Sequence, residues 1–247
     1  MQTAIQLYSV GALVIPITET LEHVGETRLD GVEFAGVGDE PPKRIRETLD
    51  RLDIDAAGAH VPVEAVESNL PAEASNCQVL GGDSLVIPIL DESQFADAAA
   101  VANTAETLSD LAASLAAYDL GLCYHNHELE FADVDNRFAF EQLVEMTDDV
   151  EFELDVGWAY AAGADPVDLL DRYADRITRV HLKDVAVDAD ADRGGRPVDL
   201  GAGDVPLREC AVAARNAGVD WAVFEHDDPD DRSVSTGSPA DEWSVEV

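Results

Sequence analysis

Lysine is almost missing from this 247-residue chain, where it occurs only at positions 43 and 183. Fifteen basic residues stand against 52 acidic ones, which gives a formal net charge of −37. Duplex nucleic acid is therefore disfavoured as a partner, because phosphate binding relies on clustered basic residues. The carboxylates are spread along the chain rather than gathered in a tail, which favours a halophilic protein over a binder of basic partners. Molar salt screens such charges to within about 3 Å.

Long apolar runs and paired cysteines are also missing. No segment approaches the roughly 20 apolar residues that span a bilayer, and the first residues, MQTAIQLYSV, lack the basic start of a secretory signal. We therefore expect a cytoplasmic protein with no membrane partner. The three cysteines at positions 77, 123 and 210 are odd in number and far apart, which favours reduced core thiols over disulfides or a zinc knuckle.

The chain alternates short β-rich runs with longer amphipathic stretches, the pattern of a parallel sheet covered by helices. Eight strands are predicted, at residues 3–9, 31–35, 56–61, 84–89, 121–127, 151–156, 179–184 and 221–226. The clearest helix is predicted over 95–118, with apolar residues at three- and four-residue steps. Eight βα units in one domain over residues 1–247 predict a single (β/α)8 TIM barrel in the α/β class. A doubly wound nucleotide-binding sheet is disfavoured, since neither G-x-G-x-x-G nor a Walker motif occurs. The segment after residue 227 is a poor helix former, so the last helix is expected to be short or missing.

Polar residues gather where several of these strands end. Alternation along each strand predicts which of them face the barrel interior. The inward set comprises His125, His127, Asp155, His181, Lys183 and Glu225. One layer deeper we expect Glu153 and Arg179 to pair, because burying one charge alone would cost about 3–5 kcal/mol. Imidazole and carboxylate donors in this combination predict one divalent ion, which is Mn²⁺, Co²⁺, Fe²⁺, Zn²⁺ or Mg²⁺.

The same segments resemble a known family. In chain order, they are IQLYS, GVEF, GAHVP, YHNHELEF, LDVGWA, RVHLKDV, LGAGDV and FEHD. Together they resemble the xylose isomerase-like TIM-barrel superfamily of sugar phosphate isomerases and epimerases, with histidines on strand five like those of inosose dehydratases. The resemblance implies that His125, Asp155, His181 and Glu225 bind the metal, with His127 or Glu128 as the alternative strand-five ligand. It also implies a carbohydrate substrate and allows a homo-oligomer.

The resemblance further implies enediolate chemistry, with a metal ion bridging a substrate carbonyl and its neighbouring hydroxyl. Glu225 would move the proton, and His127 or Glu128 would be a second acid or base on the opposite face. Lys183 would hold a substrate oxygen or phosphate. If the base instead expelled a β-hydroxyl, the same residues would serve a dehydratase.

Other readings of single residues stay open. His60 either contacts substrate or is a satisfied core residue, and Glu33 either binds substrate or pairs within the barrel. The segment 188–194 is expected to be a solvated acidic loop rather than a calcium loop. The segment 200–205 either cradles a phosphate with its amides or caps the next helix through Asp204.

Four functions remain compatible with the sequence. The first is a metal-dependent isomerase or epimerase of a sugar, sugar phosphate or cyclitol, and the second is a lyase on the same scaffold. An abasic-site endonuclease would need more metal ligands and a cationic groove than this acidic chain provides. A non-catalytic sugar-binding barrel would keep its function after Glu225→Gln.

Overall fold

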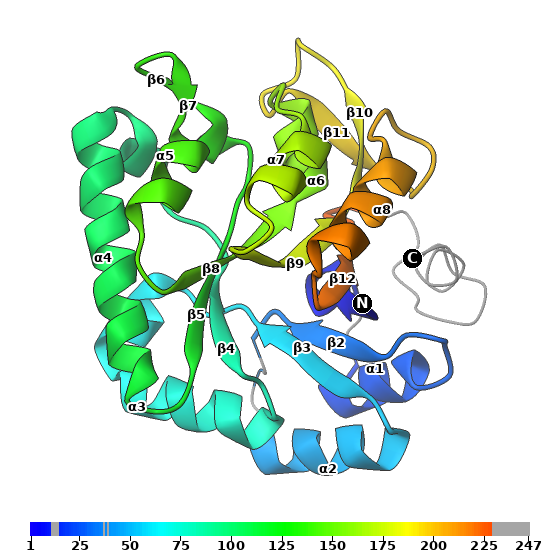
Figure 1. The fold of residues 1–247 in the computed structure, drawn as a ribbon. Coiled ribbons are helices and arrows are strands. Elements are labelled where there is room, and N and C mark those ends of the chain that lie inside the picture. Colours follow the sequence, from blue (N-terminus) through cyan, green and yellow to red (C-terminus); the bar gives the residue numbers. More distant parts are fainter. Residues whose placement is uncertain (11–14, 37, 39, 229–247) are drawn as a thin grey trace.

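Eight parallel strands form the centre of the molecule, and helices surround them (Figure 1). The computed structural model describes residues 1–10, 15–36, 38 and 40–228. In their order around the sheet, the strands are β3 (Asp55–Ala59), β2 (Gly31–Phe34), β1 (Gln2–Gln6), β12 (Trp221–Phe224), β9 (Ile177–Leu182), β8 (Val150–Asp155), β5 (Gly121–His125) and β4 (Ser84–Ile87). The amide of Val61, just beyond the end of β3, donates to the carbonyl of Val86 in β4 (2.8 Å), which brings the two edges of the sheet together. The predicted (β/α)8 barrel and its eight strands are confirmed.

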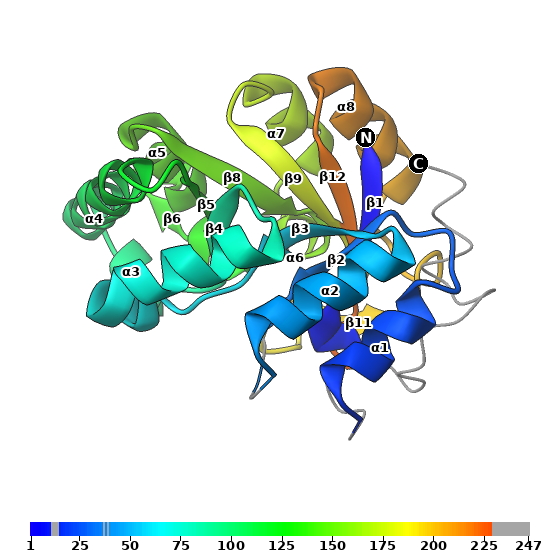
Figure 2. The ribbon, with the colours of Figure 1, turned by 90° about the horizontal axis from the view of Figure 1, so that it is seen from below.

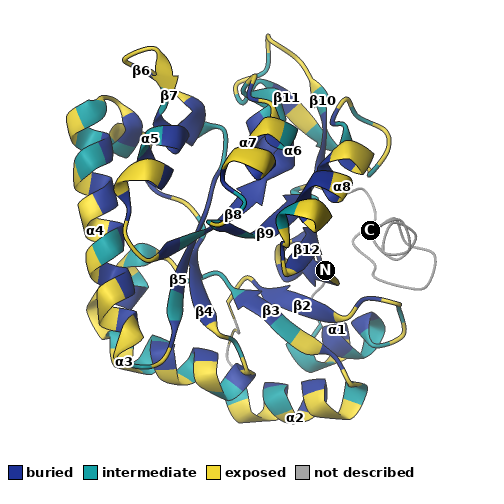
Figure 3. Cartoon of the chain, viewed as in Figure 1, coloured by how far each residue is buried: buried dark blue, intermediate teal, exposed yellow. Residues whose placement is uncertain are grey.

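The helices cover the outside of this barrel (Figure 2). Their bounds are α1 (Ile17–Val24), α2 (Pro42–Leu52), α3 (Val63–Leu80), α4 (Ala98–Ala116), α5 (Ala139–Met146), α6 (Val156–Ala161), α7 (Pro166–Arg172) and α8 (Leu207–Ala217). Their outward faces are exposed, whereas the strands are buried almost throughout (Figure 3). The core therefore lies between the sheet and the helices as well as inside the barrel.

Helix α4 begins three residues later than the sequence predicts. Asp97 has an extended backbone, and its carboxylate accepts hydrogen bonds from the amides of Ala99 and Ala100. This is N-cap geometry, which separates α4 from a short 3₁₀ turn at Glu92–Phe95. The predicted apolar face of the helix is buried as expected.

Strand β8 shows why the polar side chains enter the barrel. Phe152 and Leu154 alternate with Glu153 and Asp155, and all four are fully buried. Since side chains alternate across a strand, the apolar pair packs under the helices and the two carboxylates point into the barrel. The sequence pattern therefore places charges in the interior, where they need partners.

The predicted pairing of Glu153 with Arg179 is wrong. The two residues are register partners on β8 and β9, but the Arg179 guanidinium instead contacts Asp83 (2.7 Å) and Glu151 (3.3 Å). Arg179 lies toward the amino ends of the strands, so its long side chain reaches carboxylates at that rim. Glu153 instead contacts His60 and His181, which lie nearer the carboxyl ends of the strands.

Two hairpins extend the barrel: β6 (Asp133–Val134) with β7 (Arg137–Phe138), and β10 (Asp184–Val187) with β11 (Gly195–Val198). The tip of the second hairpin is the predicted acidic loop 188–194, whose Asp188, Asp190 and Asp192 are exposed as expected. All three cysteines are buried and unpaired. None of the described helices is long and apolar enough to cross a membrane. The predicted shortening of the last helix concerns residues 229–247, which lie outside the described part of the chain.

Candidate metal centre

Four of the predicted metal ligands meet at one point. His125, Asp155, His181 and Glu225 each offer one donor atom, and these four atoms lie within 4.8 Å of one another. They come from the carboxyl ends of β5, β8, β9 and β12, because parallel strands in a barrel end at the same face. The predicted convergence of these residues is therefore present in the structure.

His125 is held with one ring nitrogen free. Its Nδ1 lies 3.1 Å from the carbonyl oxygen of Pro88, and a carbonyl can only accept. Nδ1 therefore carries the proton, and Nε2 presents a lone pair. Nε2 is buried without a hydrogen-bond partner and lies 3.6 Å from Asp155 Oδ2. Such a backbone contact behind an imidazole is the usual support of a metal ligand.

The two carboxylate oxygens of Asp155 have different roles, one in capping a helix and one in the upper part of the barrel interior. Oδ1 accepts from the amide of Trp158 (2.9 Å) and so caps α6. Asn126 fixes the backbone beside it, since its Oδ1 accepts from the amide of Asp155 (3.0 Å). Oδ2 is buried without a directed hydrogen bond and faces His125. Burial raises the pKa of this carboxyl, but Lys183 and His125 outweigh that effect and hold the pKa below its ordinary value.

Lys183 lies among three carboxylates although it is only 1% exposed. Its Nζ is 2.9 Å from Asp155 Oδ2, 2.8 Å from Glu225 Oε2 and 2.7 Å from Asp227 Oδ1. Burial alone would lower its pKa, yet these three carboxylates raise the pKa above its ordinary value. One of the two lysines of the chain is thus a buried cation of the site.

A second cluster lies directly below the first and shares His181 with it. It consists of Glu33, His60, Glu153 and His181, whose donor atoms also lie within 4.8 Å of one another. Nε2 of His181 is 2.7 Å from Glu33 and 3.2 Å from Glu153, and Nε2 of His60 is 3.1 Å and 3.0 Å from the same two carboxylates. Burial lowers the pKa of His60, but both carboxylates raise it further, to about 9. We call this group the lower quartet and the four predicted ligands the upper cluster.

His127 and Glu128, the predicted second acid or base, differ in position. His127 lines the cavity above the upper cluster, and its buried Nδ1 has no hydrogen-bond partner. Burial, then His125 and Lys183, lower the pKa of His127 to about 2, so the imidazole is neutral. Glu128 instead binds the guanidinium of Arg193 (2.7 Å) and is absent from the upper cluster.

The upper cluster opens into a cavity of about 570 Å³ at the carboxyl ends of the strands. Among the predicted substrate-binding residues, His60 lines this cavity, whereas Glu33 and Lys183 lie deeper. Glu33 accepts a hydrogen bond from Gln6 (2.7 Å) as well as contacting His181, so it supports an imidazole of the upper cluster.

Arg193 and Trp158 were not predicted as site residues. The Arg193 guanidinium carbon lies 3.5 Å from the centre of the Trp158 ring, and Lys183 Nζ lies 5.2 Å from the same centre. Both contacts are within the range of cation–π attraction. The only signal in the sequence was a single basic residue inside the acidic loop 188–194, which gave no indication that its side chain turns back over the barrel.

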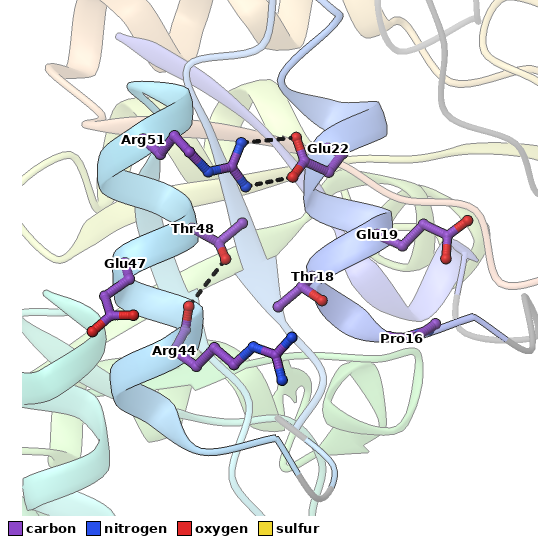
Figure 4. A pocket seen from close by; sticks show the side chains of 8 residues that line it. All are labelled: Pro16, Thr18, Glu19, Glu22, Arg44, Glu47, Thr48 and Arg51. Carbon is purple, nitrogen blue, oxygen red and sulfur yellow. Dashed lines mark hydrogen bonds and ion pairs between the residues drawn. The ribbon is translucent and has the colours of Figure 1, made fainter.

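Another hollow, of about 420 Å³, lies on the outside between α1 and α2 (Figure 4). Its arginines are paired, Arg51 with Glu22 and Arg44 with Glu40. It contains no imidazole or thiol among its lining residues. The chemistry-bearing groups of the described chain are therefore concentrated at the barrel mouth.

The expectation that Asp204 caps the next helix is wrong. Asp204 accepts a hydrogen bond from the amide of Val187 (2.8 Å), and α8 begins after Pro206 without a side-chain cap. The amide that Asp204 binds belongs to the last residue of β10, in the β10–β11 hairpin.

Comparison with known proteins places this geometry in a family. The model of the xylose isomerase-like TIM barrel family matches residues 29–245. The chain belongs to this family. Membership agrees with the resemblance seen in the sequence motifs.

Two characterised relatives match over shorter stretches. The rhizopine catabolism protein MocC of Rhizobium meliloti is 34% identical over 115 residues, which are 46% of this chain and 34% of that protein. An inosose dehydratase of Geobacillus kaustophilus is 46% identical over 69 residues, 27% of this chain and 22% of that enzyme. The match thus spans about a third or less of either relative.

Solved structures of the family share the whole fold. A sugar phosphate isomerase/epimerase from Parabacteroides distasonis superposes with a TM-score of 0.74 at 19% identity, covering 100% of this chain and 95% of that one. The IOLI protein, solved with a zinc atom, also has a TM-score of 0.74, at 14% identity and with 100% and 95% coverage. At this identity the likeness establishes the shared fold.

The residues of the upper cluster fit a divalent ion. Two nitrogen and two carboxylate donors suit zinc and the harder first-row ions. His125 Nε2 is buried without a hydrogen-bond partner, whereas Asp155 Oδ2 is ion-paired with Lys183 (2.9 Å), which a bound ion would have to displace. In the lower quartet, by contrast, the imidazole nitrogens facing the carboxylates are already hydrogen-bonded. Of the two clusters, the upper one is therefore the better metal site.

Proposed function

We infer that this chain is a divalent-metal-dependent isomerase or epimerase of a sugar, sugar phosphate or cyclitol, acting through an enediolate. The observation that carries the inference is the convergence of His125, Asp155, His181 and Glu225 beneath an open cavity. When bound, a divalent ion would supply Lewis-acid activation of a substrate carbonyl and acidify the neighbouring C–H bond. The zinc atom in the IOLI structure, which has a similar fold, supports the proposal that this site binds a metal ion.

Two of the four proposed ligands are held in place by contacts with the backbone. Asp155 and His125 are held by backbone contacts, so their donor atoms are preorganised. His181 carries a raised pKa because, although burial lowers it, Glu153, Glu225 and Glu33 surround it. Binding a cation would displace its proton, so metal uptake is expected to release protons.

Proton transfer is assigned to Glu225 and His127. Both line the cavity, Glu225 beside the upper cluster and His127 above it. Burial raises the pKa of Glu225, but Lys183 and His181 hold it well below its ordinary value, so the carboxylate is ionised. His127 is a neutral imidazole on a second side of the cavity, and its role is assigned from this position. Two such groups around one carbon allow isomerisation or epimerisation.

Lys183 is assigned to a substrate oxygen. Its Nζ lies between Asp155 and Glu225, the two carboxylates expected to bind the ion. A cation bound there would compete with Lys183 for the same oxygens and leave Nζ able to donate to a developing alkoxide.

A lyase on the same site is the second candidate. It is favoured by the 46% identity with an inosose dehydratase over 69 residues. Proton abstraction would be the same, but the second acid would protonate a departing hydroxyl. The two reactions therefore differ only after the first step.

Solvent proton exchange tests the proposal. Metal-loaded protein, incubated in D2O with ketoses and an inosose, should introduce deuterium next to the carbonyl, as read by NMR. A product that is lighter than the substrate by one water molecule would instead identify a lyase. Glu225→Gln should abolish exchange, whereas Glu106→Gln, the same change on the exposed face of α4, should not. Unchanged exchange in Glu225→Gln would contradict the proposed base.

A further inference from the structure

The segment that most resembles a phosphate cradle is already filled by the protein. Asp184 Oδ2 accepts from the amides of Gly201 (2.8 Å) and Gly203 (2.9 Å), and its Oδ1 accepts from the amide of Val205 (3.2 Å). A Cβ atom placed on Gly203 would lie 2.2 Å from Asp184 Oδ1, so the loop closes tightly around this carboxylate. These amides form a nest of the kind that binds anions, but the anion is internal. An incoming phosphate would meet a buried negative charge.

The guanidinium in the cavity wall is also neutralised. Arg193 binds Glu128 through Nε (2.9 Å) and Nη2 (2.7 Å), and Nη1 lies 3.3 Å from Asp227. One face of the guanidinium rests on Trp158. Because a phosphate is recognised by the same fork of N–H donors, Glu128 already occupies the position that a substrate phosphate would take.

The other cations around the cavity are paired as well. His60 donates its Nε2 to the carboxylates of Glu33 and Glu153. Lys183 lies beneath the cavity within 2.9 Å of three carboxylates. Within the described part of the chain, therefore, no cation that lines or underlies this cavity lacks an acidic partner.

The remaining wall is neutral. Aromatic and apolar surface in the cavity comes from Tyr8, Gly36, Pro62, Pro88 and Ile89. A dianion placed there would lose water without gaining donors, which is unfavourable. A neutral polyol suits the same cavity, since its hydroxyls can donate to carboxylates and its carbon face can lie on apolar residues.

We propose that this site takes an uncharged polyhydroxylated carbonyl compound and does not take its phosphate ester. The inference rests on the proposed function for the carbonyl, but the exclusion of phosphate rests on the paired charges alone. It narrows the substrate class from sugars and sugar phosphates to neutral sugars and cyclitols.

The test measures phosphate binding directly, without turnover. Inorganic phosphate is titrated by calorimetry into metal-loaded wild type, Arg193→Gln and the double variant Glu128→Gln/Asp227→Asn. Wild type should show no saturable binding at up to about 10 mM, whereas the double variant, with Arg193 released, should bind at least about tenfold more tightly. Submillimolar binding to wild type that Arg193→Gln abolishes would overturn the proposal.

Phosphate bound at the metal itself is distinguished by two variants. Binding that survives Arg193→Gln but disappears in Asp155→Asn would belong to the metal and would support the absence of a separate anion site. The same proteins are also titrated with D-fructose and D-fructose 6-phosphate. The wild type should not bind the phosphate ester more tightly than the free sugar. A preference of about tenfold or more for the ester would contradict the proposal, even if solvent exchange is observed. Failure of solvent exchange, conversely, would leave the phosphate result intact and reject only the enzymatic assignment.

Discussion

The upper cluster and the lower quartet contain the same types of side chain and share His181, but their hydrogen bonding differs. In the lower quartet, each imidazole faces two carboxylates at 2.7–3.2 Å. In the upper cluster, His181 Nδ1 contacts Glu225 (2.9 Å) and Lys183 Nζ lies 2.9 Å from Asp155 Oδ2, but His125 Nε2 has no hydrogen-bond partner. The two clusters therefore differ at their imidazoles, because one ring nitrogen of the upper cluster is unpaired, whereas those of the lower quartet that face the carboxylates are hydrogen-bonded.

Removing a charged ligand from the upper cluster should have the largest effect. In Asp155→Asn, Oδ1 can still cap α6, but the negative charge that faces His125 and Lys183 is lost. We expect metal affinity to fall by at least about 100-fold while the fold is retained. Metal content per chain, measured by mass spectrometry after purification in molar KCl, checks this. Asp83→Asn, the same change at an exposed carboxylate, is the control. Full metal occupancy in Asp155→Asn would remove the distinction between the two clusters.

A matching change in the lower quartet should act mainly on stability. Glu153 is fully buried and contacts the imidazoles of His60 and His181. Glu153→Gln removes its negative charge and leaves both imidazoles with one carboxylate fewer. We expect a loss of about 3 kcal/mol in the free energy of unfolding, with metal affinity reduced by no more than about 100-fold. Urea unfolding monitored by circular dichroism gives the first quantity. Glu151→Gln, on the same strand but partly exposed, should cost less than about 1 kcal/mol. If Glu153→Gln lost all metal at unchanged stability, the lower quartet would be the binding site instead.

The smallest effect is a pH dependence carried by His60. Its pKa is raised to about 9 in the folded protein, so its protonated form stabilises the fold. That contribution is fully present below the unfolded pKa of about 6.5 and is lost as the pH rises to about 9, for at most about 3 kcal/mol. The free energy of unfolding in wild type should therefore fall across this window. In His60→Gln, the free energy of unfolding should fall less steeply with pH. Equal slopes in the two proteins would show that the carboxylates of the lower quartet do not raise the pKa of His60.

Much of this arrangement was predictable because it depends on local patterns. Alternation in EFELDV and RVHLKD assigned Asp155 and His181 to the interior, and parallel strands bring their ends together. The convergence of the upper cluster followed from that periodicity together with the family resemblance. Among the strand-five alternatives, our proposal of His125 as the ligand is supported by a long-range contact, that of its Nδ1 with the carbonyl of Pro88.

Partners that come from distant segments could not be predicted. Glu153 was expected to bind Arg179, its neighbour in the register, but the side chain of Arg179 extends toward Asp83 at the opposite rim. Capping of the next helix was one of two alternatives for Asp204, but its carboxylate binds the amide of Val187 in the β10–β11 hairpin. In both cases, sequence spacing identified a possible partner, and the packing of another element supplied a better one.

The barrel, its strands and the set of inward polar residues follow from the sequence, because side-chain alternation and helical periodicity are properties of neighbouring residues. Which partner each of those residues binds depends on contacts between distant segments. Glu33 and Glu153 each contact two histidines through Oε2, Asp184 accepts from the amides of the loop 201–205, and Arg193 binds Glu128. Whether a polar group binds a ligand or another part of the protein depends on three-dimensional distances of a few ångströms between strands and loops far apart in the chain.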